Sequence, residues 1–322
     1  MLRYRKIGIR YINTIQIFLE NNLDRFAKQF YPKHFSDKRA VTRFMLKEIT
    51  EKLQNGTGLA AYNDSQLQAF GILSKSEWDS EILEKRTGRL NLYTLLSRSE
   101  NEAYVLKMLS LASKNDLDVI FARVDITQID VLQAILRKGA VLADILITFC
   151  RSTGKKQSPA SFCLNKRTDI TFEDAKVTDE KELRKITMAS YGFSHYFNDP
   201  NIPAEKAGCI YRKWIEDSLR GYADFVITAK VSGKIVGYVT IRLEKLNGDG
   251  FSIIDLIAVS QKYRGRGIGK MLVNEGIART YNKASKVYAS TQASNLAALH
   301  LYHGLGFKPA LSQAALHVWL NT

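Results

Sequence analysis

A glycine-rich turn between an apolar strand and a helix constrains the fold of this chain more than any other feature. Apolar residues from Ile253 to Val259 predict a short strand, and a helix is predicted over 270–278. The turn between them reads Arg264-Gly265-Arg266-Gly267-Ile268-Gly269. Its R-x-x-G-x-G spacing is neither that of a P-loop nor that of a dinucleotide-binding fold. Such a turn points several backbone N–H groups one way at the positive end of a helix dipole, which predicts a phosphate or pyrophosphate site.

The order of predicted strands and helices repeats along the chain at an offset of 167 residues, the spacing from Gly139 to Gly306. At this offset Gln128 lies opposite Asn295, and Ile135 lies opposite Tyr302. A repeat of this length predicts two copies of one α/β plan with a mixed sheet. The first copy lacks the glycines of the turn, the asparagine and the tyrosine, so we expect it to be degenerate. The predicted boundaries are a first domain over 1–150, a polar linker over 151–168 and a second domain over 169–322.

The R-x-x-G-x-G turn, together with Asn295 and Tyr302 downstream, resembles the acetyl-CoA site of the GNAT superfamily of N-acetyltransferases. The resemblance implies tandem GNAT-like domains in which only the second keeps an intact acetyl-CoA site. It implies acetyl-CoA as co-substrate and no metal. In the superfamily the strand before the turn separates from its neighbour and offers backbone hydrogen bonds to the pantetheine arm and the acetyl carbonyl, here from Ile257 and Val259. The expected donor-binding residues are Leu256, Ile257, Ala258, Val259, Arg264, Gly265, Arg266, Gly267, Ile268, Gly269, Lys270, Asn295 and Tyr302.

Transfer of an acetyl group to an amine needs a proton for the departing thiolate and a neutral amine. A phenol has a pKa of about 10 and a thiol of about 8.5, so a tyrosine keeps its proton at neutral pH and can donate it to the thiolate. Tyr302 is the expected acid. The base is less well specified, and the candidates are Asp255, Glu244, His195, His317 or an ordered water. Asp255 could equally form an ion pair with a nearby Lys or Arg.

The acceptor is expected from a narrower resemblance. Ser290-Thr291-Gln292, Asn295, Gly306-Phe307 and His317-x-Trp319, together with Trp78-Asp79-Ser80, resemble the dTDP-fucosamine (WecD-like) branch of the superfamily, which acetylates a nucleotide-linked amino sugar. The first half is longer than in that branch, and the sequence from Ser194 to Phe197 departs from its pattern. A protein or aminoacyl amine is the alternative acceptor, and a non-catalytic CoA-binding regulatory module is the alternative function. The expected substrate-binding residues are His195, Tyr196, Phe197, Tyr211, Arg212 and His317.

The net charge of +15 is spread over both halves and is accompanied by no nucleic-acid-binding signature, so we expect no nucleic-acid partner. A basic surface equally attracts anionic small molecules such as CoA. The three cysteines, at 150, 163 and 209, have no metal-ligand spacing and fit free thiols. The sequence contains no run of 18 uncharged apolar residues that would span a membrane. We expect a cytoplasmic enzyme, monomeric or homodimeric.

Overall fold

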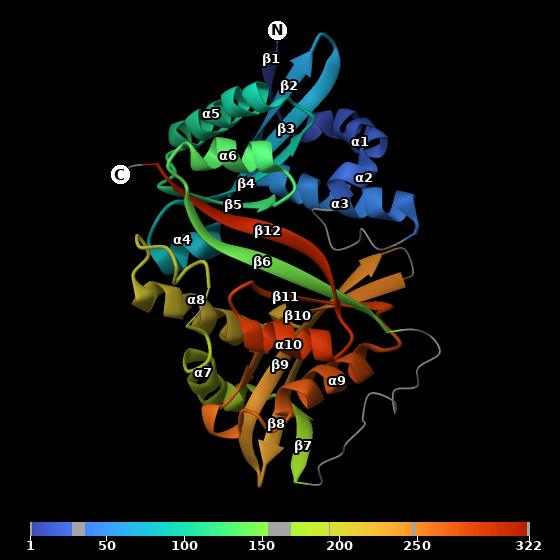
Figure 1. The fold of residues 1–322 in the computed structure, drawn as a ribbon, viewed down its shortest axis with the longest axis vertical. Coiled ribbons are helices and arrows are strands. Elements are labelled where there is room, and N and C mark those ends of the chain that lie inside the picture. The colour runs from blue at the N-terminus through green and yellow to red at the C-terminus, as the bar shows by residue number, and fades with distance from the viewer. Residues whose placement is uncertain (1, 28–35, 154–168, 193, 247–248, 321–322) are drawn as a thin grey trace. The chain divides into compact units, whose positions relative to one another are not determined.

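The computed structural model describes residues 2–27, 36–153, 169–192, 194–246 and 249–320. The chain forms two compact units (Figure 1). Unit 1 consists of Met1–Leu146 and Leu311–Thr322, and unit 2 of Ile147–Ala310. Within the described ranges, no helix combines the length and apolar character needed to cross a membrane.

Unit 1 is built on a mixed sheet with the strand order β1-β2-β3-β4-β5-β12. Neighbouring strands pair antiparallel except β4 and β5, which run parallel from Thr87↔Val119 to Leu90↔Ala122. A parallel pair needs a crossover, and α5 supplies it. The strands are β1 (Arg3–Ile7), β2 (Gly56–Asn63), β3 (Gln66–Lys75), β4 (Thr87–Thr94), β5 (Val119–Asp125) and β12 (Lys308–Trp319).

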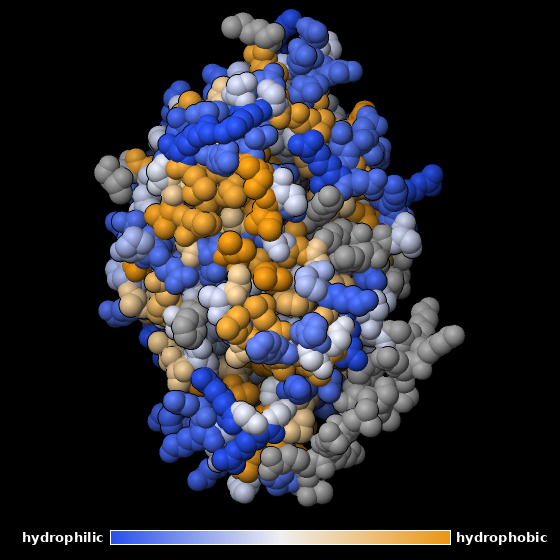
Figure 2. All heavy atoms as spheres, viewed as in Figure 1, coloured by the Kyte–Doolittle hydropathy of each residue, from blue (hydrophilic) through white to orange (hydrophobic). Residues whose placement is uncertain are grey.

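Helices cover both faces of the unit 1 sheet. Side chains alternate between the two faces of each strand, so neighbouring residues of one strand pack with different helices. On β2, Ala60 packs with α1, α2 and α3, whereas Leu59 and Ala61 pack with α5 and α6. Figure 2 shows apolar side chains gathered over α6, where Ile129 is 50% exposed. The helices are α1 (Ile12–Asn21), α2 (Leu23–Phe26), α3 (Lys38–Gln54), α4 (Glu77–Leu83), α5 (Arg98–Lys114) and α6 (Ile129–Leu136).

Unit 2 has the strand order β6-β11-β10-β9-β8-β7, and a cluster of its buried apolar residues forms a hydrophobic core. Ile241 and Val239 of β9 pack with α9 in that core, whereas Tyr238 points to the opposite face and meets Thr187 of α7. The strands are β6 (Val141–Ser152), β7 (Ile170–Asp174), β8 (Phe225–Val231), β9 (Lys234–Leu246), β10 (Asp249–Val259) and β11 (Lys286–Gln292). The helices are α7 (Glu180–Met188), α8 (Ala204–Asp217), α9 (Ile268–Thr280) and α10 (Leu296–Gly304).

The two units share one plan, as the internal repeat predicts. The parallel pair β10–β11 with α9 and α10 in unit 2 matches β4–β5 with α5 and α6 in unit 1. Gln128 and Asn295 both occupy the N-cap of the matching helices. Gly139 and Gly306 both have positive φ, 81° and 78°, just beyond those helices. The α/β fold with a mixed sheet in tandem copies is therefore confirmed.

The compact units differ from the sequence-based boundaries at two strands. Residues 311–320 of the C-terminal half belong to unit 1, where β12 pairs with β5 from Gln313↔Asp125 to Trp319↔Val119. Residues 147–152 of the N-terminal half belong to unit 2, where Thr148 shares a hydrogen bond with Ser290 of β11 (2.8 Å). These two segments are assigned to their units by strand pairing with partners far away in the sequence. Amino-acid composition carries no information on such pairing. Most of the predicted linker, 154–168 with Cys163, lies outside the described residues.

Candidate active site

Strand β10 of unit 2 carries a bulge next to a gap in the sheet. Ile254 pairs with Ile241 and Ile257 with Val239, so two residues, Asp255 and Leu256, stand opposite the single residue Thr240. On the other edge, β10 pairs with β11 only from Phe251↔Lys286 to Ile254↔Ala289. Beyond that point the two strands continue to Val259 and Gln292 without further pairing in the described residues. The strands therefore separate directly beside the bulge.

The bulge directs backbone groups of two residues into this gap. The amide of Leu256 donates to Oγ1 of Thr240 (3.0 Å), and that of Ser260 donates to the carbonyl of Val236 (2.8 Å), both on the β9 side. Successive residues of a strand alternate the edge toward which their N–H and C=O groups point. Ile257 and Val259 therefore direct theirs toward the edge where β11 has separated. Both side chains are half-buried, whereas Leu256 and Ala258 are buried.

The glycine-rich turn leads from β10 to the first turn of α9. Gly265 and Gly267 have φ values of 75° and 81°, a region that residues with a Cβ adopt at a cost. Gly267 is the N-cap of α9, and among the described residues no side chain caps it. The N–H groups of the first helical turn have no partner within a helix, so they are available to an anion. The residues of the turn are exposed at Arg264–Gly267 and Lys270, half-buried at Gly269 and buried at Ile268.

Arg264 braces the turn through its side chain. Its Nε donates to the carbonyl of Val259 (2.9 Å), and its Nη2 donates to Oγ of Ser190 (3.0 Å). The guanidinium thus ties the turn to β10 and to the end of α7. Arg266 instead lies over the ring of Tyr263, with 5.2 Å from Cζ to the ring centroid.

Tyr302 is buried in the core of unit 2 at 2% exposure. Its ring contacts those of Phe149 (5.8 Å between centroids) and Phe307 (5.4 Å). Burial raises the pKa of its hydroxyl well above the usual value of a tyrosine. The hydroxyl therefore holds its proton throughout the neutral range and can act as a donor.

Asn295 begins the helix that carries Tyr302. Its Oδ1 accepts a hydrogen bond from the backbone N–H of Ala298 (3.1 Å), which satisfies one of the unpaired donors of α10. The geometry thus gives Asn295 a helix-capping role. Any contact with a pantetheine arm stays a prediction.

Asp255 and Glu244, the two candidate bases, converge on one arginine that the sequence analysis did not single out. Nε of Arg242 donates to Oδ2 of Asp255 (2.6 Å) and Nη2 donates to Oδ1 (3.3 Å), while Nη1 reaches Oε1 of Glu244 (3.2 Å). The ion pair allowed for Asp255 is therefore present. The Asp255 side chain is 8% exposed, and burial raises its pKa while Arg242 opposes that shift.

The predicted acceptor residues of unit 2 lie on the segment before α8 and on α8 itself, where Tyr211 is the centre of an aromatic cluster. The ring of Tyr211 stacks on that of Tyr191 (4.5 Å, 11°) and also contacts Phe197 and Trp214. His195 and Tyr196 are both buried, with 4.0 Å between ring centroids. Arg212 is exposed, and its Nη2 lies 3.1 Å from Sγ of Cys209.

His317 lies on the part of β12 that belongs to unit 1, whereas the other predicted site residues lie in unit 2. It is 1% exposed and pairs with Phe121, with 4.3 Å between the two ring centroids. A role in acceptor binding stays a prediction for this residue.

Tyr191 is the second residue that the sequence analysis did not single out. Its hydroxyl accepts a hydrogen bond from the N–H of Ile257 (2.8 Å) and donates one to the carbonyl of the same residue (2.9 Å). Nothing in its sequence context indicates a contact with a strand 66 residues away.

The matching turn of unit 1 is occupied by its own side chains. A capping box joins Ser97 and Glu100 at the start of α5, where Oε2 of Glu100 accepts from the backbone N–H of Ser97 (2.9 Å). Hydrogen bonds from Ser97 lower the pKa of Glu100, so this position carries a negative charge. A cavity of about 550 Å³ adjoins this turn, and the charged residues in its lining are Asp24, Arg25, Asp125 and Asp130.

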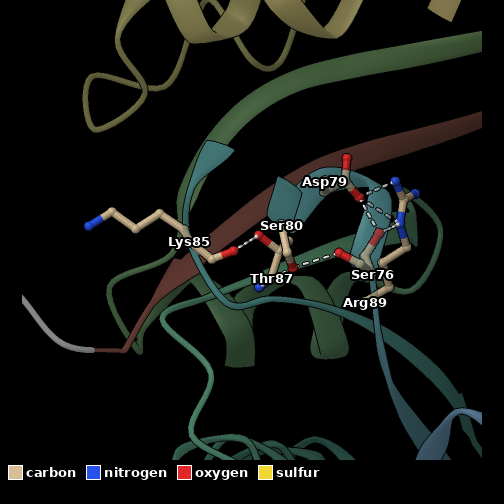
Figure 3. A network of polar contacts seen from close by, with 6 residues as sticks. All are labelled: Ser76, Asp79, Ser80, Lys85, Thr87 and Arg89. Atoms are coloured by element: carbon tan, nitrogen blue, oxygen red, sulfur yellow. Dashed lines mark hydrogen bonds and ion pairs between the residues drawn. The ribbon is translucent and has the colours of Figure 1, made fainter. Parts of the chain in front are cut away.

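Within the Trp78-Asp79-Ser80 sequence, Asp79 and Ser80 join α4 to β4 in unit 1 (Figure 3). Asp79 is fully buried and binds Nη2 of Arg89 (2.5 Å) and Oγ of Ser76 (2.5 Å). Oγ of Ser80 accepts from the backbone N–H of Thr87 (2.9 Å). These contacts describe a structural network. Among the described residues, no group of three or more His, Cys, Asp or Glu side chains is placed to hold a metal ion.

Comparison with protein families and curated proteins identifies several related sequences. The model of the acetyltransferase (GNAT) family matches residues 182–307. The spore coat polysaccharide biosynthesis protein SpsD of Bacillus subtilis is 25% identical over 284 residues, which cover 88% of this chain and 95% of that protein. A dTDP-fucosamine acetyltransferase of Escherichia coli is 33% identical over 142 residues, which cover 43% of this chain and 59% of that enzyme.

Solved structures share the fold at low sequence identity. A GCN5-related N-acetyltransferase from Sphaerobacter thermophilus aligns with a TM-score of 0.65 at 14% identity, covering 100% of this chain and 96% of that one. A tandem GNAT protein from the clavulanic acid biosynthesis pathway aligns with a TM-score of 0.62 at 12% identity, covering 100% of this chain and 99% of that one.

A further curated relative has a higher sequence identity. An N-alpha-acetyltransferase of Sulfurisphaera tokodaii is 34% identical over 160 residues, which cover 44% of this chain and 83% of that enzyme. The chain therefore belongs to the acetyltransferase (GNAT) family.

Proposed function

We propose that this protein is an acetyl-CoA-dependent N-acetyltransferase that acts on the primary amine of a small acceptor, a nucleotide-linked amino sugar. The observation that carries the proposal is the combination, in unit 2, of a bulged strand, its separation from β11 and a helix N-terminus after a glycine turn that no described side chain caps. Each element supplies one part of a site for a long thioester donor with an anionic end.

The donor would lie along the outer edge of β10. The pyrophosphate binds the backbone N–H groups from Gly265 to Gly269, where a Cβ would hinder close approach. The pantetheine arm enters the gap between β10 and β11, and the thioester carbonyl accepts a hydrogen bond from the N–H of Ile257. A backbone donor aimed at this oxygen polarises the carbonyl and stabilises the charge that develops on it during attack.

Tyr302 donates the proton to the departing thiolate. Because burial raises the pKa of its hydroxyl, the phenol is protonated before the reaction and becomes a donor as negative charge grows on sulfur. Asp255 is a stronger candidate for the base than Glu244, since burial raises its pKa. The ion pair with Arg242 opposes that role, and His195 or an ordered water are the other routes for the amine proton.

The acceptor binds against the aromatic cluster around Tyr211. Aromatic faces suit a base or a sugar ring, and an arginine such as Arg212 suits a diphosphate. The hydroxyl of Ser194 and the indole N–H of Trp214 are buried and have no hydrogen-bond partner among the described residues. Two relatives also favour a sugar-linked acceptor, since their names refer to spore coat polysaccharide synthesis and to dTDP-fucosamine.

A protein amino terminus is the second candidate acceptor. It is favoured by the 34% identity to an N-alpha-acetyltransferase, although that match covers only 44% of this chain. The two acceptors differ in size and charge, so one panel of amines separates them.

The test measures thiol release from acetyl-CoA with nucleotide-linked amino sugars and with peptides that have a free amino terminus. Wild-type protein is expected to turn over an amino-sugar nucleotide. Tyr302→Phe should lower kcat by about 100-fold or more, while the Kd for acetyl-CoA changes little.

Tyr104→Phe is the matched control, because that buried hydroxyl lies in unit 1 and donates to the carbonyl of Leu59 (2.6 Å). It should leave kcat unchanged. Wild-type turnover in Tyr302→Phe would remove Tyr302 from the role of acid. If the protein binds acetyl-CoA but transfers the acetyl group to no amine, it is a non-catalytic CoA-binding module and not an enzyme.

A further inference from the structure

One hydroxyl group satisfies both backbone polar groups of the bulge residue. Ile257 donates its N–H to the hydroxyl oxygen of Tyr191 (2.8 Å), and that hydroxyl donates its proton to the carbonyl of Ile257 (2.9 Å). A tyrosine hydroxyl has one proton and accepts through its lone pairs, so both bonds form at once. Both lie on the edge of β10 where β11 has separated.

Tyr191 is held at both ends. Its ring stacks on Tyr211 (4.5 Å between centroids, 11° between planes), and Tyr211 contacts Phe197 and Trp214. Its hydroxyl also interacts with that of Tyr238. The Tyr238 hydroxyl lies 2.6 Å from Oγ1 of Thr187, which donates to the carbonyl of Leu183 (2.7 Å). One side chain thus connects the aromatic cluster to the backbone of β10.

The N–H of Ile257 is the group to which the proposed function assigns the thioester carbonyl. A hydroxyl oxygen and a thioester oxygen cannot both make a full, well-aligned hydrogen bond to one N–H, so the two compete. CoA, the product, ends in a thiol whose sulfur is a weak acceptor. CoA therefore does not compete with Tyr191 for this position, whereas acetyl-CoA does.

We propose that Tyr191 is a positioning residue that responds to the acyl group of the donor, occupying the Ile257 N–H until a thioester carbonyl displaces it. In the free protein and with CoA bound, the hydroxyl stays on Ile257. Acetyl-CoA takes the N–H, and the Tyr191 ring shifts against Tyr211 within the cluster proposed to receive the acceptor. The inference rests on the proposed function, because it requires acetyl-CoA to bind along β10.

The experiment is calorimetric titration of the full chain with acetyl-CoA and, separately, with CoA. Tyr191→Phe keeps the ring and removes only the competing hydroxyl. It is expected to bind acetyl-CoA about threefold to tenfold more tightly than wild type, the size of one net hydrogen bond, with an unchanged Kd for CoA. Tyr104→Phe, which also loses a buried hydroxyl bonded to a backbone carbonyl, should change neither Kd.

Tyr191→Leu serves as a second variant, since it removes the same hydroxyl and should shift the ratio of the two Kd values in the same direction. A ratio of acetyl-CoA to CoA affinity that stays the same or falls in the folded variants would overturn the inference while leaving the proposed function intact. If wild-type protein binds neither acetyl-CoA nor CoA, the proposed function itself fails, and the inference fails with it.

Discussion

Replacing Arg242 with methionine is expected to destabilise unit 2 strongly, because the change leaves a buried carboxylate without its cation. Arg242 donates two hydrogen bonds to Asp255 (2.6 Å and 3.3 Å), and the Asp255 side chain is only 8% exposed. Removing one partner of a buried ion pair costs about 3–5 kcal/mol, since the remaining charge loses both water and its counterion. Methionine keeps the aliphatic volume of the side chain, so lost packing contributes little.

The free energy of unfolding is measured by urea denaturation of wild type, Arg242→Met and the double variant Arg242→Met/Asp255→Leu. The double variant removes both charges and should recover most of the loss. A loss below about 1 kcal/mol in the single variant would show that Asp255 is solvated. An equal loss in the single and double variants would place the cost in packing and refute the electrostatic account.

The same pair predicts a dependence on pH. Burial raises the pKa of Asp255, so the folded protein favours its protonated form more than the unfolded chain does. Its contribution to stability is therefore most favourable below the usual aspartate value of 3.8 and is lost as the pH rises through the raised value. Without Arg242 this pKa rises further. The penalty of Arg242→Met should accordingly be smaller at about pH 5 than at about pH 8.

Two further substitutions test the two turns that the repeat places in matching positions. Gly267→Ala should weaken acetyl-CoA binding and lower the free energy of unfolding by about 1–2 kcal/mol. Gly139→Ala, at the same φ of 81° in unit 1, should lower the free energy of unfolding equally without changing the Kd for acetyl-CoA. Equal Kd values for both variants would contradict the assignment of the donor site to the turn at Gly267. Ser97→Ala should lower the free energy of unfolding, measured by thermal denaturation, by about 1 kcal/mol because it removes the cap of α5. Ser113→Ala, exposed on the same helix, should change it by less than about 0.5 kcal/mol. An equal loss in both variants would show that the cap contributes nothing.

Local patterns predicted most elements of the fold but not the partners of its strands. The apolar periodicity and the glycine turn predict β10 and α9, and both form, over Asp249–Val259 and Ile268–Thr280. The strand β7 (Ile170–Asp174) has no clear apolar pattern in the sequence, because only its first residue is buried and its outer residues are polar. No local pattern indicates that β12 pairs with β5, since this pairing joins segments almost 200 residues apart and depends on the packing of the whole unit.

The candidate site also combines residues that follow a local sequence pattern with residues that do not. The glycines, Asn295 and Tyr302 follow a local spacing that a sequence displays. Arg242 lies 13 residues from Asp255, on the neighbouring strand, and Tyr191 lies 66 residues from Ile257. Their roles depend on register and on the bulge at Asp255–Leu256, which only the folded sheet defines. A charged residue and a tyrosine in such positions look like ordinary strand and loop residues in the sequence.

The most direct test of the account is the stoichiometry of acetyl-CoA binding to the whole chain. Unit 2 offers a helix N-terminus after a glycine turn that no side chain of the described residues caps, whereas the matching turn of unit 1 carries the capping box of Ser97 and the negative charge of Glu100. Calorimetric titration is therefore expected to give one site per chain. A stoichiometry of two would show that unit 1 also binds the donor, and the absence of binding would contradict the central claim.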